Sequence, residues 1–449
     1  FPLPIIFGNL LQQLYNLADG KIVSTYVGTQ AFAAVGATAV IANLIIGFVN
    51  GVTQGFGIPI SRCFGAGDYK NMRRYVAGSF IMTVAMTLIL TVGALLGIEG
   101  LLHILDTPAD IMEEALQYIR IIIMGTAFIS LYNYSANILR AVGESRIPLL
   151  CLVVAVILNI FLDILFVHTF SMGLRGAAHA TNIAQCIAGV LCMAYLLFRF
   201  RELVPKGQEW QVQRRKYQEM TVFGISLGMM SCFVSIGTVI FQTAVNRLGT
   251  KIVTAHIAAR RIEELTNVPM LCTGMAMTTY ASQNLGAGEY DRINKGIHQA
   301  FVIVLVQGVI FTTFCWIFGH PLIRWITSSN DTYILDTAYR YLTRNTSFYF
   351  VLGPLFVLRC SLQGLEHKVI PVASSILELV LKIVSTIWIV PVLGYTGVIY
   401  TEPIIWIFMT LMLIGGYVRA LKQINEAEHI KSARNAKAEN EKINVDNRL

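Results

Sequence analysis

Charged side chains are scarce in this chain of 449 residues. Asp, Glu, Lys and Arg together make up 13% of it, whereas hydrophobic residues make up 55%. Soluble globular proteins carry about 25% charged residues, roughly twice as many. The composition therefore argues against an ordinary soluble protein and indicates that most of the chain lies in a lipid bilayer.

Several motifs of enzymes and metal proteins are also absent. The sequence contains no P-loop Gly-x-x-x-x-Gly-Lys, which argues against ATP-driven transport by this chain alone, and no His-Glu-x-x-His zinc motif. Its eight cysteines form no Cys-x-x-Cys pair, so we expect them to act as small hydrophobic residues. We therefore expect neither enzymatic activity nor a cofactor.

In place of charge, the sequence has a series of long apolar segments. A membrane-spanning helix needs about 20 residues of this kind. Twelve candidates recur along the chain: 3–27, 32–58, 75–98, 116–139, 148–170, 176–198, 221–246, 252–280, 297–319, 338–363, 370–391 and 396–418. The sequence thus predicts an all-α integral membrane protein with twelve transmembrane helices.

The chain also repeats itself at a distance of 221 residues. A Gly-Thr pair at 28–29 returns at 249–250, and Gly-Ala-Gly-Asp-Tyr at 65–69 returns as Gly-Ala-Gly-Glu-Tyr at 286–290. One offset, held across apolar segments and loops, indicates a duplicated unit. Because each copy has six spans, both have the same orientation. This predicts two six-helix bundles related by a pseudo-two-fold axis along the membrane normal.

Four regions follow from this organisation. We expect an N-terminal six-helix bundle at 1–200, a polar cytoplasmic linker at 201–220, a C-terminal six-helix bundle at 221–421 and a charged cytoplasmic tail at 422–449. The linker is rich in turn-forming and charged residues, which marks it as the boundary between the two bundles.

The net charge of +8 is distributed unevenly over the loops. Basic residues collect after the second, fourth and sixth segments, including Arg140 and Arg146 after the fourth. The loop at 99–115, on the opposite side, has acids but no Lys or Arg. By the positive-inside rule, both termini are cytoplasmic. Because these charges follow the membrane loops, we expect the lipid bilayer as a partner and no nucleic acid.

Ionisable groups inside the predicted spans are few. A carboxylate at the bilayer centre costs about 2.5–3.5 kcal/mol, so each is a functional hypothesis. Asp19 lies deep in the first span, Asn159 and Asp163 share a face of the fifth, and Thr181 follows on the sixth. Such oxygen ligands suit Na⁺, and two adjacent carboxylates could instead share a proton. The alternative is that Asp19 or Asp163 lies near an interface and caps a helix or bonds to the backbone.

The second half does not copy these acids, since at the offset of 221 Asp19 is matched by Ile240. Glu378 and Lys382 lie one turn apart in the eleventh span, where they could neutralise one another or bind substrate. The residues that we expect in a substrate cavity are polar and lie within spans: Tyr15, Asn16, His256, Glu264, Glu378, Lys382 and Glu402.

Two more of these cavity candidates, besides Glu378 and Lys382, have an ordinary structural alternative. Glu264, with Glu263, follows Arg260 and Arg261 and could simply pair with them. His256 could be a hydrogen-bonded interior histidine rather than a proton relay.

Several short motifs together resemble those of the multidrug and toxic compound extrusion (MATE) transporters, and in part their bacterial DinF-like branch. The resemblance covers all twelve spans. The motifs are Asp19 with Val27-Gly28 and Ala34-Val35-Gly36; Pro-Ile-Ser-Arg-Cys-Phe-Gly-Ala-Gly at 59–67; Asn-Ile-Phe-Leu-Asp at 159–163 with Gly173, Gly176 and Thr181; Gln-Asn-Leu-Gly-Ala-Gly at 283–288; and Gln363-Gly364 with Pro371.

The resemblance implies a multi-pass protein of a bacterial inner (cell) membrane, functional as a monomer. By alternating access it would export amphipathic, often cationic, small organic compounds in exchange for Na⁺ or H⁺. In prokaryotic members the first-half ion site uses residues that correspond to Asp19, Asn159, Asp163 and Thr181 here. Members with further acids in the seventh and tenth segments differ from this chain, which has no obvious deep carboxylate in either.

Two other functions remain open at this point. A flippase for lipids or lipid-linked oligosaccharides could use the same scaffold, and it would need basic residues in a lipid-open groove. Few deep Lys or Arg residues are visible, and Lys382 is the exception. A membrane-embedded enzyme would need a nucleophile–base pair or a metal constellation, which we do not find.

Overall fold

The structure is a computed structural model that describes residues 2–105 and 107–446, with side chains described except at 16–18, 21, 29, 32 and 427–446. Every regular element in this part of the chain is helical. Among the described residues, nine helical stretches are long and apolar enough to cross a membrane. Together with α1, α9 and the α11–α12 pair they make twelve spans, as predicted.

The first half contains six spans. They are α1 (Pro2–Tyr26), α2 (Thr29–Gly65), α3 (Tyr69–Ile104), α4 (Met112–Met124) with α5 (Thr126–Ala141), α6 (Arg146–Asp163) with the π-helix η1 (Ile164–Thr169), and α7 (Gly173–Arg199). Two short 3-10 helices, η2 (Arg201–Leu203) and η3 (Gly207–Trp210), connect this half to the second.

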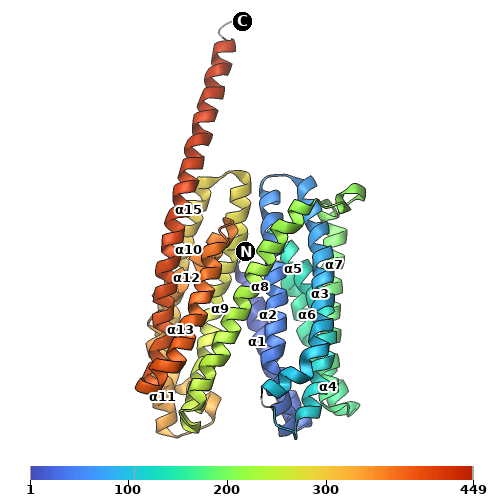
Figure 1. Ribbon diagram of the computed structural model, residues 1–449, viewed down its shortest axis with the longest axis vertical. Helices are drawn as coiled ribbons and strands as arrows, with labels where there is room; N and C mark the ends of the chain where they lie inside the picture. Colours follow the sequence, from blue (N-terminus) through green and yellow to red (C-terminus); the bar gives the residue numbers. More distant parts are fainter. Residues whose placement is uncertain (1, 106, 447–449) are drawn as a thin grey trace.

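The second half repeats this order. It comprises α8 (Arg214–Asn246), α9 (Thr250–Ala287), α10 (Tyr290–Thr327), α11 (Thr332–Thr346) with α12 (Tyr349–Gly364), α13 (Val369–Val384) with the π-helix η4 (Ser385–Ile389) and α14 (Val390–Leu393), and α15 (Tyr395–Asp446). The charged tail continues α15 as one helix that projects beyond the other helices (Figure 1).

The duplicated loops adopt the same backbone conformation in both halves. Gly28 and Gly249, which precede α2 and α9, have φ of 118° and 96°. Gly67 and Gly288, which follow these two helices, have φ of 68° and 67°. Residues with a side chain rarely adopt such angles, whereas glycine does so readily. The repeated glycines therefore stand where both halves turn the chain in the same way.

Two groups of helices stand side by side, and α8 crosses diagonally between them (Figure 1). The α2 and α8 helices pack at very short range, because a Cβ added at Gly51 or Gly55 would lie 2.6 Å from the carbonyl oxygen of Leu227 or Phe223. Small residues permit this close approach of helices within a membrane, where van der Waals packing drives association. The α2–α8 contact is thus a main seam between the bundles.

The π-helices occupy the same place in the repeat. η1 begins at Ile164, directly after Asp163, and η4 begins at Ser385, which is 221 residues later. Short π-helical segments are rare and occur often at functional sites. Each follows the helix that carries the predicted buried charges of its half, α6 or α13.

Candidate functional site

The first candidate site lies inside the first bundle, where α1, α6 and α7 meet. Asn159 and Asp163 are fully buried on α6. With the Asn159 amide oriented to suit its neighbours, its nitrogen donates to Asp163 Oδ2 (3.0 Å) and its oxygen accepts from the backbone N–H of Thr181 (3.2 Å). One amide therefore orients the Asp163 carboxylate and ties α6 to α7.

α1 supplies the second acid. The carboxyl group of Asp19 lies close enough to that of Asp163 to share a hydrogen bond when one of them is protonated. One turn earlier, the Tyr15 hydroxyl donates to Thr181 Oγ1 (3.1 Å). The structure thus brings all four residues of the predicted ion site together. It also places Tyr15, a predicted cavity residue, in the same cluster.

The two acids have no counter-charge in the described part of the chain. The Oδ1 atoms of Asp19 and Asp163 are buried without a hydrogen-bond partner, and neither acid takes part in an ion pair there. A buried, unpaired carboxylate costs several kcal/mol. Because the two carboxyl groups lie within hydrogen-bonding reach and each has an unpartnered oxygen, the cluster fits a small monovalent cation, either H⁺ or Na⁺.

One residue of this cluster was missed from the sequence. Tyr118 on α4 is 8% exposed and lies near both Asp19 and Asp163. It follows the acidic start of α4 in an otherwise ordinary apolar segment, so no local pattern singles it out. Only the packing of α4 against α2 and α7 places its ring beside the acids.

The buried charges of the second half, by contrast, are paired. Lys382, 2% exposed, places its Nζ 3.1 Å from Glu378 Oε1 and 3.3 Å from Glu402 Oε1, and donates to Thr238 Oγ1 (3.3 Å). Arg359 adds a second cation, with its Nη2 3.5 Å from Glu378 Oε2. Three of the predicted cavity residues therefore form one network around Lys382.

A second paired cluster lies on α9. Glu263 is fully buried between Arg260, whose Nη1 lies 3.1 Å from its Oε2, and Tyr341, whose hydroxyl donates to the same oxygen (3.0 Å). The neighbouring Glu264 is partly exposed and lies 3.8 Å from both Arg260 and Arg261. Arginines of the same helix thus pair with both acids, while Glu263 Oε1 is buried without a hydrogen-bond partner.

The remaining predicted cavity residues are His256 and Asn16. His256 is buried on α9, with its Nδ1 3.5 Å from the Tyr395 hydroxyl and its ring edge-on to Tyr341 at 4.9 Å. This is the environment of a packed interior histidine. The side chain of Asn16 lies outside the described residues.

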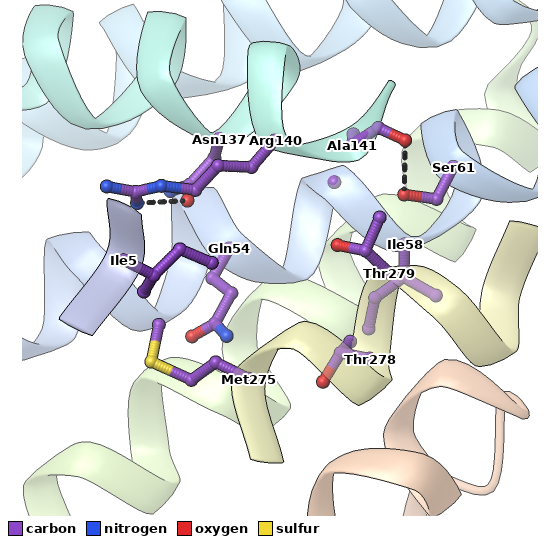
Figure 2. A pocket seen from close by; sticks show the side chains of 11 residues that line it. Ile5, Gln54, Ile58, Ser61, Asn137, Arg140, Ala141, Met275, Thr278 and Thr279 are labelled. Carbon is purple, nitrogen blue, oxygen red and sulfur yellow. Dashed lines mark hydrogen bonds between the residues drawn. The ribbon is translucent and has the colours of Figure 1, made fainter. Parts of the chain in front are cut away.

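A small cavity of about 30 Å³ lies between the two bundles, lined by α1, α2, α5 and α9 (Figure 2). Arg140, which we expected in a loop after the fourth segment, lies instead in the last turn of α5 and lines this cavity. The position follows from helix length, because α5 continues to Ala141 and carries Arg140 into the seam between the bundles.

Hydrogen bonds and ion pairs close one end of this seam. Ser282 Oγ of α9 donates to the Ile58 carbonyl of α2 (2.8 Å), and Gln283 Nε2 donates to the Ala141 carbonyl of α5 (2.8 Å). The duplicated segments at 61–65 and 282–286 therefore meet each other across the bundle interface.

Arg62 adds a charged link at the same end. It forms ion pairs with Glu219 of α8 (2.8 Å) and with Glu366, between α12 and α13. Burial raises the pKa of the Glu366 carboxyl, while the Arg62 guanidinium acts in the opposite direction. One arginine of the first bundle thus holds two acids of the second.

A Gly-x-Ser-x-Gly pattern at 224–228 lies within α8. Such a pattern serves as a nucleophile elbow only at a sharp strand-to-helix turn. Here Gly224 and Gly228 instead face Phe56, Val52 and Phe48 of α2. The glycines therefore serve helix packing.

Comparison with known proteins gives a consistent result over both halves. A family model described as MatE matches the chain twice, at residues 4–165 and 227–388. The probable multidrug resistance protein YpnP of Bacillus subtilis (strain 168) is 26% identical over 393 residues, covering 87% of this chain and 85% of that protein. The probable multidrug resistance protein YoeA of the same organism is 24% identical, covering 84% and 82%.

Solved structures agree with the fold. A crystal structure of MATE in the bent conformation superposes with a TM-score of 0.82 at 24% identity, covering 96% of this chain and 95% of that one. This chain therefore has the same overall fold as that structure.

Proposed function

The chain belongs to the MatE family of transporters, and on that premise we propose that it exports small amphipathic organic compounds in exchange for a cation that moves inward. It is a multi-pass membrane protein and not an enzyme. The observation that carries the exchange proposal is the buried pair Asp19 and Asp163, which has no counter-charge among the described residues. Such a pair changes its charge when one cation binds.

We propose that the coupling cation is H⁺. Na⁺ bound in proteins is expected to prefer several oxygen ligands, as other hard cations do. Here Asn159 presents its N–H to Asp163, and Thr181 Oγ1 already accepts the Tyr15 hydroxyl. The Asn159 amide would have to turn before its oxygen could face a Na⁺ ion, and Thr181 Oγ1 has only one lone pair left. A proton needs only the two facing carboxyl groups.

The same contacts connect the charge of the site to helix position. Asp19 and Tyr15 lie on α1, Asp163 on α6 and Thr181 on α7. When one proton binds, the repulsion between the two carboxylates is removed and α1 can pack closer to α6. Exchange requires that the cation favour one conformation and the exported compound the other. We assign the coupling to this movement of α1.

We propose that the second bundle holds no coupling ion. Lys382 and Arg359 compensate Glu378 and Glu402, and Arg260 compensates Glu263. The same pairing weighs against a flippase, because Lys382 is engaged by two carboxylates and is not available to a lipid phosphate. The paired network instead suits a scaffold role.

Three finer features are part of the proposal. The motifs at 283–288 and 363–364 favour the bacterial DinF-like branch. The basic loops favour cytoplasmic termini and a cytoplasmic linker between bundles at 1–200 and 221–421. We also propose that the monomer is the functional unit, because both the ion cluster and the inter-bundle cavity are built from one chain.

The test uses the purified protein in liposomes, with ethidium as a fluorescent organic cation and an imposed pH or Na⁺ gradient. We expect a pH gradient to drive ethidium transport in the wild type. Asp19→Asn and Asp163→Asn should each reduce it at least tenfold, and the exposed Asp336→Asn should not. Undiminished transport in both site variants would remove the proposed site. A response to Na⁺ without a pH gradient would assign the coupling to Na⁺.

A further inference from the structure

Arg140 is a cation at the bundle interface without an acidic partner. Its Nη1 donates to Asn137 Oδ1 (3.3 Å), one turn earlier on α5, and it lies beside Tyr132. Its Nε is buried and has no hydrogen-bond partner. Within the described part of the chain, Arg140 forms no ion pair with any carboxylate.

This state distinguishes Arg140, which is partly buried, from several other buried or partly buried cations that do have acidic partners. Arg62 binds two glutamates, Arg260 binds Glu263, and Lys382 and Arg359 share Glu378. A buried charge is costly unless it is paired, which explains why those residues have partners. Arg140 is partly buried, and a group that compensates its charge would have to come from outside the described residues.

The chemistry of the side chain defines the partner. A guanidinium is planar and permanently charged, and its N–H fork matches the two oxygens of a carboxylate or a phosphate. Ordered water could solvate it, but a carboxylate also compensates the charge. The group that Arg140 is best suited to bind is therefore an anion.

The surroundings indicate a ligand with an apolar body. Figure 2 shows Arg140 and Asn137 on one wall of the cavity, with Gln54 and Met275 across from them and Ile5 between. Ile5 and Met275 supply apolar contact, and the flexible thioether of Met275 adapts to varied shapes. Gln54 makes no hydrogen bond to the described residues and is available to a ligand.

The location indicates a transported ligand. The lining comes from α1, α2 and α5 of the first bundle and α9 of the second. Its volume of about 30 Å³ accepts only a small group while the seam is closed. A ligand held between Arg140 and α9 would thus be sensitive to the separation of the two bundles, as alternating access requires.

We propose that Arg140 binds the anionic group of the exported compound, so that the substrates include amphipathic carboxylates and zwitterions. The inference rests on the proposed export function and narrows its substrate class. An organic cation without an acidic group is repelled by Arg140 and has to bind elsewhere in the space between the bundles.

The test uses three dansyl probes of similar size in proteoliposomes with the imposed gradient: dansyl-aminohexanoate, its neutral amide, and dansylcadaverine. We expect the carboxylate to be transported at least tenfold faster than the amide. Arg140→Gln should abolish that preference by slowing carboxylate transport, whereas dansylcadaverine transport should not fall, because the variant removes a charge that repels this cation. Arg140→Lys should retain part of the preference, because a point charge replaces the fork. The matched control is Arg261→Gln, a partly exposed arginine of α9.

The outcomes separate the two proposals. Equal transport of carboxylate and amide by the wild type, or an unchanged preference in Arg140→Gln, would overturn the inference while export itself stands. If neither the dansyl probes nor ethidium are transported in response to an ion gradient, the proposed export function itself is wrong. A third outcome is that Arg140→Gln loses transport of all probes equally but still binds the carboxylate as tightly as the wild type does. That result would assign Arg140 a structural role and overturn the inference.

A lipid is the other source of an anionic group. The same assay in phosphatidylcholine liposomes, with and without phosphatidylglycerol, distinguishes it from a soluble substrate. We expect carboxylate transport to be independent of phosphatidylglycerol. Inhibition by that lipid in the wild type but not in Arg140→Gln would mean that Arg140 holds a lipid headgroup, which would contradict the proposal.

Discussion

Gly65 of α2 packs directly against the backbone carbonyl of Gln283 in α9. A Cβ added at Gly65 would lie 1.9 Å from that oxygen, and one added at Gly286 would lie 1.9 Å from the carbonyl oxygen of Arg62. The two glycines are equivalent in the repeat, and each contacts the opposite copy. The most visible feature of the sequence is thus a pair of reciprocal contacts across the bundle interface.

Gly65→Ala should weaken this closed end. The atom that the methyl group would meet belongs to the backbone, so α2 and α9 must separate; overpacking of this kind costs about 1–3 kcal/mol. We expect a lower melting temperature and transport reduced several-fold. Gly93→Ala is the control, since nothing lies within 4 Å of a Cβ there. If the two variants have the same melting temperature and the same transport rate, the close contact at Gly65 contributes to neither stability nor transport.

Arg62→Gln should open the same end without a steric change. It removes the cation between Glu219 and Glu366, and the two acids then repel each other. Spin labels at Lys70 and Asp291, in a background without the native cysteines, report the distance between the bundles. We expect a longer or broader distance distribution than in the wild type. An unchanged distribution would assign the closure to the glycine contacts alone.

The unpaired and paired buried charges should respond in opposite ways to neutralisation. Asp163→Asn removes a charge that has no counter-charge, so we expect unchanged or higher thermal stability together with loss of coupling. Gradient-driven ethidium transport in liposomes measures the coupling, and a melting curve measures the thermal stability. A strongly destabilised Asp163→Asn would indicate that the ionised carboxylate has a partner in the native protein.

Lys382→Met should instead lower stability strongly. It leaves Glu378 and Glu402 buried together, and breaking a buried pair in this way typically costs about 3–5 kcal/mol. Adding Glu402→Gln should recover a large part of the loss, because it neutralises the acid that lost its only ion-pair partner in the described chain, whereas Arg359 still pairs with Glu378. If the double variant is no more stable than the single one, the Lys382–Glu402 contact does not contribute as the distances indicate.

Asp68, at the start of α3, provides a test of local structure by pH. Its side chain accepts from the backbone N–H (3.0 Å) and the amide (2.6 Å) of Asn71, and these hydrogen bonds lower the pKa of Asp68. The stabilisation is present above the unfolded value of about 3.9 and is lost as the pH falls through the lower folded value. Asp68→Ala should therefore lose about 1 kcal/mol at pH 7, as for other N-caps.

The control for this prediction is Asp68→Asn, because asparagine caps helices about as well as aspartate. Melting curves at pH 7 and near pH 3 provide the measurement. The difference between wild type and Asp68→Ala should shrink at the lower pH. A difference that stays constant over this range would mean that the carboxylate is not the capping group.

The sequence by itself determined the membrane location, the twelve spans and the duplication, and it predicted that Asp19, Asn159, Asp163 and Thr181 belong together. Hydropathy acts over about 20 residues. Asn159 and Asp163 share a helix face because they are four residues apart. The absence of a second acid opposite Asp19 was visible as Ile240 at the repeat offset. All of these are properties of single helices or of the repeat, and need no knowledge of how helices cross.

Only the tertiary structure decided which charges are compensated. Lys382 finds Glu402 on α15 and Arg359 finds Glu378 on α13, whereas Arg140 and the two acids of the ion cluster find no such partner in the described chain. Tyr15 and Tyr118 likewise join the acids through contacts between different helices. The reason is physical: helix crossings set these distances, and crossings depend on packing between segments that lie far apart in sequence.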